Sequence, residues 1–344
     1  MGSYFPVTYY PNTTIEAEAT VVEVSPGRVV DKVDIVLGNA SQGLSLEGVA
    51  IDVESGAPVL GAAVRFTSFV ATYVQGVGGK VVTDSTGRFR IAGLMPGRYD
   101  LSILPDRTQG DAYFGELLSV ELLDVNLTGL VLKARRGGLL RGVVVFGENA
   151  QVRAQEVSLL AVSISGPEGS RIAPDFQSTS PTSEGSFELL SPPGLVRLAL
   201  DGLRSPRNVS IVTVERQGSV IGSDLNIEPG STIDGLSVVL GVGTGIIEGH
   251  VRPMDAVVAS HARLVVVAQL VDGLRQRRSA NVDARGQFRF DALLEGEYQV
   301  RLAIIPNSAN AVPMAPPAAQ SVRLANGETR SVEFAVEVQA EPQD

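Results

Sequence analysis

The chain has 344 residues, a formal net charge of −10 and no cysteine. The acidic balance argues against nucleic acid and anionic membranes as partners, and the missing thiols exclude disulfides and thiolate metal sites. Because the sequence contains no run of 18 apolar residues, we expect no membrane-spanning helix. Its apolar residues are mostly Val, Leu, Ile and Ala, and its 37 glycines suit strands joined by tight turns.

Residues 1–43 have the pattern of a truncated repeat or of an N-terminal strand-donating segment. We predict strands at residues 21–24 and 33–37, on either side of a turn at Ser25-Pro26-Gly27. Three of the seven tyrosines fall within the first ten residues, and an isolated tail of this composition would expose its rings. We therefore expect these aromatic residues to pack on the first sandwich of this chain or on another subunit. The predicted assembly anchors are Tyr4, Phe5, Tyr9 and Tyr10.

The stretch from Thr83 to Leu101 predicts strands and turns within a first repeat, residues 44–134. Asp84 begins a turn that Gly87 completes, because Asp can accept a hydrogen bond from its own backbone two residues on and Gly tolerates positive φ. Apolar and charged residues then alternate as on a half-buried strand, and Pro96-Gly97 makes a second turn.

The same pattern recurs at residues 183–198 and 283–300, so we predict a second repeat at 135–242 and a third at 243–344. A repeat of this length is a whole domain. Alternation without a 3.6-residue period predicts about seven strands per repeat and an all-β fold of tandem Greek-key β-sandwich domains. Each repeat opens alike, with Leu46-Glu47-Gly48-Val49, Leu140-Arg141-Gly142-Val143 and Ile247-Glu248-Gly249-His250.

Four motifs of the first repeat together resemble a known family. They are G-x-V, P-V-x-G-A-x-V at Pro58–Val64, T-D-x-x-G-x-F at Thr83–Phe89 and G-L-x-P-G-x-Y at Gly93–Tyr99. This order resembles the carboxypeptidase regulatory-like family of prealbumin-like (transthyretin-like), Ig-like β-sandwiches, and it is similar to B-type repeats of bacterial surface proteins. The resemblance implies the fold rather than an activity. It also implies an accessory module, of the kind found in peptidases, outer-membrane transporters and long surface proteins.

B-type repeats often carry an intramolecular Lys–Asn isopeptide bond, which the resemblance would imply here. The chain has only Lys32, Lys80 and Lys133, and the second and third repeats have none. Because Lys80 and Lys133 do not lie in the opening strand, we expect no such bond.

No group of residues marks a catalytic site. His250 and His261 are the only histidines, and neither belongs to a metallopeptidase motif, so we interpret both as structural. No G-x-S-x-G elbow occurs, and the glycines at 241–245 indicate a linker rather than a phosphate-binding loop. Asp84 and Asp283 each offer one carboxylate, which favours turn capping over calcium binding. We predict no catalytic residue, no cofactor and no metal.

The sequence favours a non-enzymatic structural array of an extracellular or cell-surface protein. We see no signal peptide in this chain, so export would require one to have been removed. The partners would be other protein subunits, including copies joined head to tail into a filament by strand addition, or neighbouring domains of a longer chain. The alternative is an accessory module that binds carbohydrate or protein for a larger secreted enzyme or outer-membrane transporter.

Overall fold

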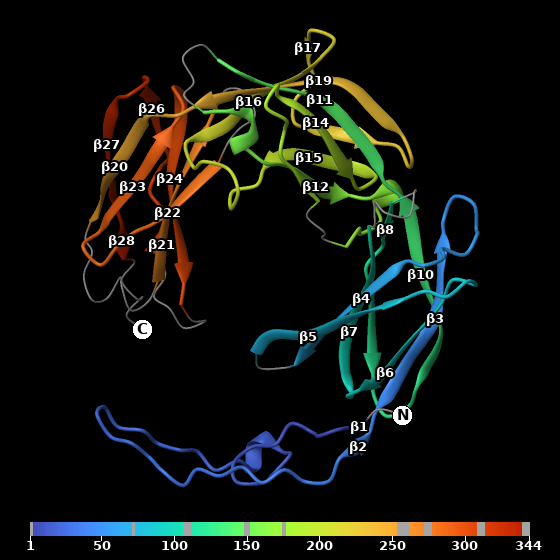
Figure 1. Cartoon of the computed structure of the whole chain (residues 1–344). Coiled ribbons are helices and arrows are strands. Elements are labelled where there is room, and N and C mark those ends of the chain that lie inside the picture. Colours follow the sequence, from blue (N-terminus) through green and yellow to red (C-terminus); the bar gives the residue numbers. More distant parts are fainter. Residues whose placement is uncertain are drawn as a thin grey trace. The chain divides into compact units, whose positions relative to one another are not determined.

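The computed structural model describes residues 3–70, 73–105, 112–147, 152–173, 177–252, 262–271, 277–307 and 314–338. Strands dominate them (Figure 1), which confirms the predicted all-β fold. Among these residues, no helix is long and apolar enough to cross a membrane. The chain divides into two compact units, one of Met1–Gly137 with Ser165–Asp175 and one of Gly138–Ile164 with Phe176–Asp344. Short 3-10 helices are η1 (Glu16–Glu18), η3 (Ala154–Glu156) and η4 (Pro167–Gly169).

The first sandwich consists of two four-stranded sheets, with the strand orders β6-β3-β10-β8 and β5-β4-β7-β9. Its opening strand β3 runs parallel to its closing strand β10, and the other pairs are antiparallel. The strands are β3 (Leu44–Asp52), β4 (Ala63–Val70), β5 (Tyr73–Val82), β6 (Arg88–Leu94), β7 (Gly97–Leu104), β8 (Tyr113–Gly115), β9 (Leu118–Leu122) and β10 (Leu127–Arg136).

The second sandwich pairs a five-stranded sheet, β14-β11-β19-β16-β17, with a four-stranded sheet, β13-β12-β15-β18. Its opening strand β11 again runs parallel to a closing strand, β19. The strands are β11 (Gly138–Phe146), β12 (Leu159–Ser165), β13 (Ser178–Thr179), β14 (Ser186–Ser191), β15 (Gly194–Leu200), β16 (Val209–Arg216), β17 (Ser219–Val220), β18 (Asp224–Ile227) and β19 (Thr232–Val242).

The third sandwich pairs the sheets β23-β20-β27 and β22-β21-β24-β26, and β20 runs parallel to β27. In a further antiparallel pair, β25–β28, the two strands lie on either side of β26 and β27 in the sequence. The strands are β20 (Gly245–Arg252), β21 (Ala262–Leu270), β22 (Arg277–Asn281), β23 (Gln287–Leu293), β24 (Gly296–Pro306), β25 (Met314–Ala315), β26 (Gln320–Leu324), β27 (Thr329–Ala335) and β28 (Glu337–Val338).

Each sandwich encloses its own apolar core, built from side chains of both its sheets. In β6, for example, Phe89 and Ile91 are buried whereas Arg88 and Arg90 are exposed, as the alternation predicts. The core residues fall within 46–134, 140–240 and 247–336.

The two aspartate turns adopt the predicted geometry. Asp84 accepts hydrogen bonds from the backbone N–H of Thr86 at 2.7 Å and of Arg88 at 3.0 Å, and Gly87 has a φ of 74°. Asp283 likewise caps the turn that ends at Gly286, whose φ is 81°. Hydrogen bonds, first from the Thr86 side chain, lower the pKa of Asp84. Both carboxylates therefore serve the turns, which confirms the turn-capping interpretation.

The glycine of each opening strand allows the closing strand to approach closely. A Cβ on Gly48 would lie 2.3 Å from the carbonyl oxygen of Leu130, and one on Gly142 would lie 2.1 Å from that of Leu236. At Gly249 the oxygen of Val332 would be 1.8 Å away. Any side chain here would force the parallel strands apart, so the shared glycine is required by the sandwich itself.

The strands predicted at residues 21–24 and 33–37 do not form in this chain, and this prediction was wrong. Residues 20–40 contain no assigned strand, and every one of them is exposed. Two backbone hydrogen bonds hold this stretch to earlier residues, from Thr20 to Tyr10 and from Val36 to Pro11, each at 2.9 Å. A β-strand needs a pairing neighbour, and no described strand pairs with these residues.

A segment inside the second repeat belongs to the first compact unit, which the sequence did not predict. Its Ile172 forms an antiparallel bridge with Glu116, just after β8. Nearby, the buried Arg135 guanidinium binds Glu54 at 2.9 Å, Glu116 at 3.1 Å and Glu168 at 3.3 Å. Burial of Arg135 opposes its charge, but hydrogen bonds to Glu116 and Glu54 outweigh this and raise its pKa.

Candidate functional site

The most unusual surface of the chain is its N-terminal arm, defined here as residues 3–42 (dark blue in Figure 1). Strand β1 (Ser3–Tyr4) pairs antiparallel with β2 (Ser41–Gln42), and β1 also contacts β6 of the first sandwich. The arm therefore leaves and rejoins the first unit at one place. Between these two strands it makes a long excursion whose only regular element is η1.

The excursion exposes many large apolar side chains. Between residues 20 and 40 these are Val21, Val22, Val24, Val29, Val30, Val33, Ile35, Val36 and Leu37. Soluble proteins rarely leave so continuous an apolar stretch in water unless it binds something. The backbone of the same stretch makes few hydrogen bonds, so it can pair with the edge of a sheet.

The four predicted anchors all lie in the first ten residues of the chain, at the start of the arm, but they do not form one cluster on its outer surface. Tyr4 is half-buried in β1 and lies close enough to Tyr99 to affect its phenol, whose pKa is raised chiefly by burial and further by Tyr4. Phe5 is 54% exposed. Tyr9 and Tyr10 are half-buried within the arm, where Tyr9 bridges to Thr13.

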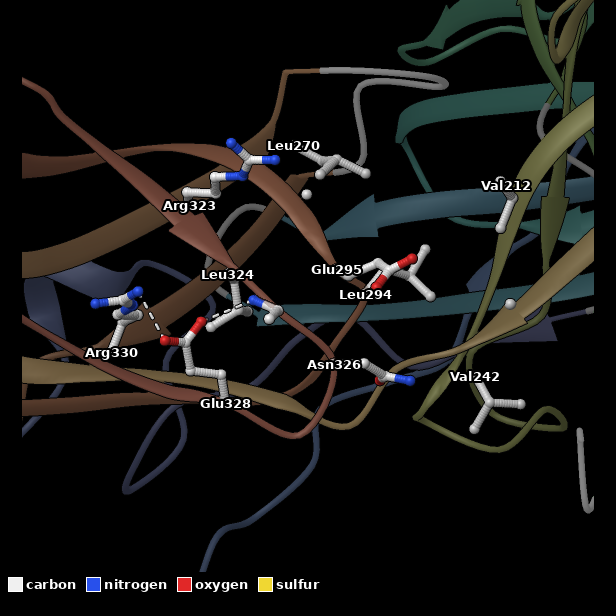
Figure 2. Close-up of a pocket in the computed structure, with 13 residues that line it drawn as sticks. Val212, Val242, Leu270, Leu294, Glu295, Arg323, Leu324, Asn326, Glu328 and Arg330 are labelled. Carbon is white, nitrogen blue, oxygen red and sulfur yellow. Dashed lines mark hydrogen bonds and ion pairs between the residues drawn. The ribbon is translucent and has the colours of Figure 1, made fainter.

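A second candidate is a cleft of about 850 Å³ where the second and third sandwiches meet (Figure 2). Its apolar wall includes Val212, Leu294 and Leu324, and its rim is charged. Figure 2 shows the Glu328 carboxylate directed at Arg330, with which it forms an ion pair at 2.7 Å. None of the 13 lining residues has a hydroxyl, thiol, imidazole or aromatic ring, so the cleft offers no Ser, Thr, Cys or His nucleophile and no stacking surface for a sugar. Of its two carboxylates, Glu295 and Glu328, the second is bound by Arg330 and by the backbone N–H of Ala325.

The glycine-rich stretch at 241–245 borders this cleft and is packed tightly. A Cβ on Gly243 would lie 2.4 Å from the backbone oxygen of Ala292, and the Gly243 N–H donates to Asn208 at 2.7 Å. The backbone here is committed to protein contacts rather than open to a phosphate. This geometry supports the linker interpretation.

The histidine that the structure describes, His250, is a strand residue. His250 lies in β20, opposite Gln287 of β23 and Glu333 of β27, as expected for a strand residue. His261 lies outside the described residues. In the part of the chain that the structure describes, no three His, Cys, Asp or Glu side chains are placed to hold a metal ion.

The buried carboxylate of Asp52 has a structural environment. It accepts hydrogen bonds from the backbone N–H of Glu54 at 2.9 Å and of Ser55 at 3.3 Å, and from the hydroxyl of Tyr113 at 3.1 Å. Burial alone would raise its pKa, but these hydrogen bonds outweigh burial, so the pKa of Asp52 lies below its ordinary value of 3.8. An ionised, fully bonded carboxylate of this kind stabilises a turn and does not act as an acid or base.

Comparison with known proteins places the chain in no family. No family model matches it, and no curated protein matches it. Among solved structures, the Bacillus anthracis TIE protein is 13% identical over 88% of this chain, with a TM-score of 0.23. The chain spans about half of that protein, 53% of its length.

Two pilins are similar at the same level. A streptococcal ancillary pilin is 10% identical over 86% of this chain and 99% of its own, with a TM-score of 0.24. BcpA, the major pilin subunit of Bacillus cereus, is 12% identical over 87% of this chain and 100% of its own, with a TM-score of 0.22. At these TM-scores the likeness assigns neither a family nor a function, so the function has to be inferred from the chain's own geometry.

Proposed function

We propose that the chain is a non-enzymatic structural module array of an extracellular or cell-surface protein. In this role its sandwiches act as spacers, and the N-terminal arm joins it to another polypeptide by strand addition. Where that polypeptide is a second copy, the contact is head to tail and extends into a filament. The observation that carries the proposal is the arm, in which residues 20–40 are all exposed although nine of them are large and apolar.

Two further observations support a structural rather than an enzymatic role. The carboxylates Asp52 and Asp84, whose pKa values are lowered, are engaged by backbone donors, and the cleft in Figure 2 has no hydroxyl, thiol or imidazole side chain. We propose Tyr4, Phe5, Tyr9 and Tyr10 as the assembly anchors of the arm, since aromatic residues dominate the energetics of interfaces.

Light scattering and electron microscopy of the purified chain test this proposal. Where the partner is a second copy, the native chain should exceed its monomer mass of 36.1 kDa in a concentration-dependent way and should form fibres. A variant in which residues 20–40 are replaced by a Gly/Ser stretch of equal length should remain monomeric, because it keeps β1 and β2 but loses the apolar side chains. Equal mass for both proteins, with no fibres from either, would show that copies of this chain do not join through the arm.

A further inference from the structure

The arm repeats features of the closing half of a sandwich of this same chain. The first is a turn. In the arm, the N–H of Arg28 donates to Ser25 at 3.0 Å, and Gly27 has a φ of 75°. In the second sandwich, the turn between β18 and β19 has the same hydrogen bond, from Ser231 to Glu228 at 3.0 Å, and its Gly230 has a φ of 70°.

The second feature is a positive φ five residues after the turn glycine. Lys32 has a φ of 58°, a conformation that costs a side-chain-bearing residue energy and that few non-glycine residues adopt. Its counterpart is Gly235, with a φ of 75°, at the bulge where β19 shifts register against β11. The first sandwich has the same bulge at Gly129, with a φ of 73°. Lys32 therefore holds the backbone shape of a closing strand that has no sheet beside it.

The third feature is the apolar pattern on both sides of the turn. The counterparts, counted from the turn glycine, are Val22 and Leu225, Val24 and Ile227, Val33 and Leu236, Ile35 and Val238, and Leu37 and Leu240. In the second sandwich these positions are core, at 0–6% exposure. In the arm the same positions are 36–65% exposed. The arm thus exposes side chains whose counterparts in the second sandwich are buried in the apolar core.

The strand pair at the base of the arm, β1–β2, also has a counterpart in a sandwich of this chain. The antiparallel pair β1–β2 encloses the arm as the pair β25–β28 encloses the closing strands of the third sandwich. In the second and third sandwiches the two closing strands belong to different sheets, β18 and β19 in one case and β26 and β27 in the other. This explains why residues 20–24 and 33–37 of the arm do not pair with each other. Each of these two segments needs an edge on a separate sheet.

We propose that the arm's partner is a β-sandwich of this same type that lacks its two closing strands, and that residues 20–37 complete it. This inference rests on the strand addition of the proposed function and names the partner's class. Because the three described sandwiches of this chain already hold their closing strands, the partner it names is an incomplete sandwich of another polypeptide rather than a second copy of this chain. Residues 20–24 add antiparallel to one sheet, as β18 adds to β15, and residues 33–37 add parallel to the partner's opening strand, as β19 adds to β11.

The geometry also specifies one residue of the partner. In each of the three described sandwiches the opening strand has glycine where a core-packing residue of the closing strand crosses it, as Gly142 meets Leu236. Val33 is the counterpart of Leu236, so the partner needs glycine opposite Val33. Any larger residue would clash with the Val33 carbonyl oxygen and prevent the parallel pairing.

A chimera tests the inference within one polypeptide. Residues 44–111, which hold the strands β3 to β7 of the first sandwich, are placed directly before Ser3 of the full chain. The graft supplies an opening strand with Gly48 and lacks β8 to β10, so the arm can complete it. Hydrogen–deuterium exchange should slow at least 100-fold for amides of residues 20–37 compared with the native chain, because paired amides in a sandwich are protected.

Two matched controls make the result specific. A graft of residues 44–136 is already a complete sandwich, so residues 20–37 should exchange as fast as in the native chain. A Gly48→Val change in the incomplete graft should remove the protection. Unchanged exchange with the incomplete graft, or equal protection with both grafts, would overturn the inference. Because these chimeras test folding within one chain, the outcome does not depend on whether native chains associate, which the light-scattering experiment decides.

Discussion

Gly142→Ala tests the close crossing of opening and closing strands on which each sandwich depends. The added Cβ would lie 2.1 Å from the oxygen of Leu236, and ordinary contact begins near 3.4 Å, so β11 and β19 must separate locally by about 1.3 Å. A shift of this size breaks the flanking ladder hydrogen bonds, at about 1 kcal/mol each, and loosens the core beneath them. With the strain of overpacking, we expect a loss of about 2–4 kcal/mol from the second sandwich.

Gly202→Ala is the matched control. Gly202 lies in the same repeat as Gly142, and a Cβ added there would have no neighbour within 4 Å. This control should be neutral or should stabilise by up to about 1 kcal/mol through the unfolded chain. Since a chain with several cores need not unfold in one step, the readout should be local, by hydrogen exchange of β11 and β19 peptides in a urea series. If Gly142→Ala exchanges like Gly202→Ala, the close crossing does not constrain the fold and the reasoning is refuted.

Three further predictions concern the first and third sandwiches. Gly87→Val should destabilise by about 1–3 kcal/mol in a urea melt, since φ is 74° there and a Cβ would lie 2.7 Å from Pro58; an unchanged melt would contradict it. Burial raises the pKa of Tyr298 to about 12, so its stabilisation is complete below pH 10 and is lost as the pH rises to 12; Tyr298→Phe should flatten the alkaline limb of stability against pH. The lowered pKa of Asp52 means that its stabilisation is present above about pH 4 and is lost as the pH falls through the folded pKa; Asp52→Asn should flatten the acid limb, and parallel curves for variant and native chain would refute this.

Local chemistry determined much of what the sequence predicts correctly. The strand β6 follows from the alternation of Arg88, Phe89, Arg90 and Ile91, because a period of two places one set of side chains on each face. The turn before it follows from Asp84 and Gly87, which need nothing beyond four consecutive residues. The parallel pairing of opening and closing strands, by contrast, joins residues about 80 positions apart, as in Leu46 with Leu127.

Only the tertiary structure decided features that depend on distant partners. Position 48 needs glycine because the backbone of Leu130 crosses it too closely to leave room for a Cβ. The residues next to Gly48 in the sequence do not by themselves require glycine there. The docking of Ile172 beside Glu116 likewise depends on an exposed edge after β8 that the sequence does not mark.

The N-terminal arm shows the same division most clearly. Its sequence has the alternation of Val33, Ile35 and Leu37 that predicts a strand, and its backbone even keeps the bulge conformation at Lys32. No strand forms at residues 33–37, because a strand is stabilised by hydrogen bonds to a neighbouring strand and by packing on an apolar core. The sequence therefore determined the apolar alternation of residues 33–37, whereas the tertiary structure decided that no described strand pairs with them.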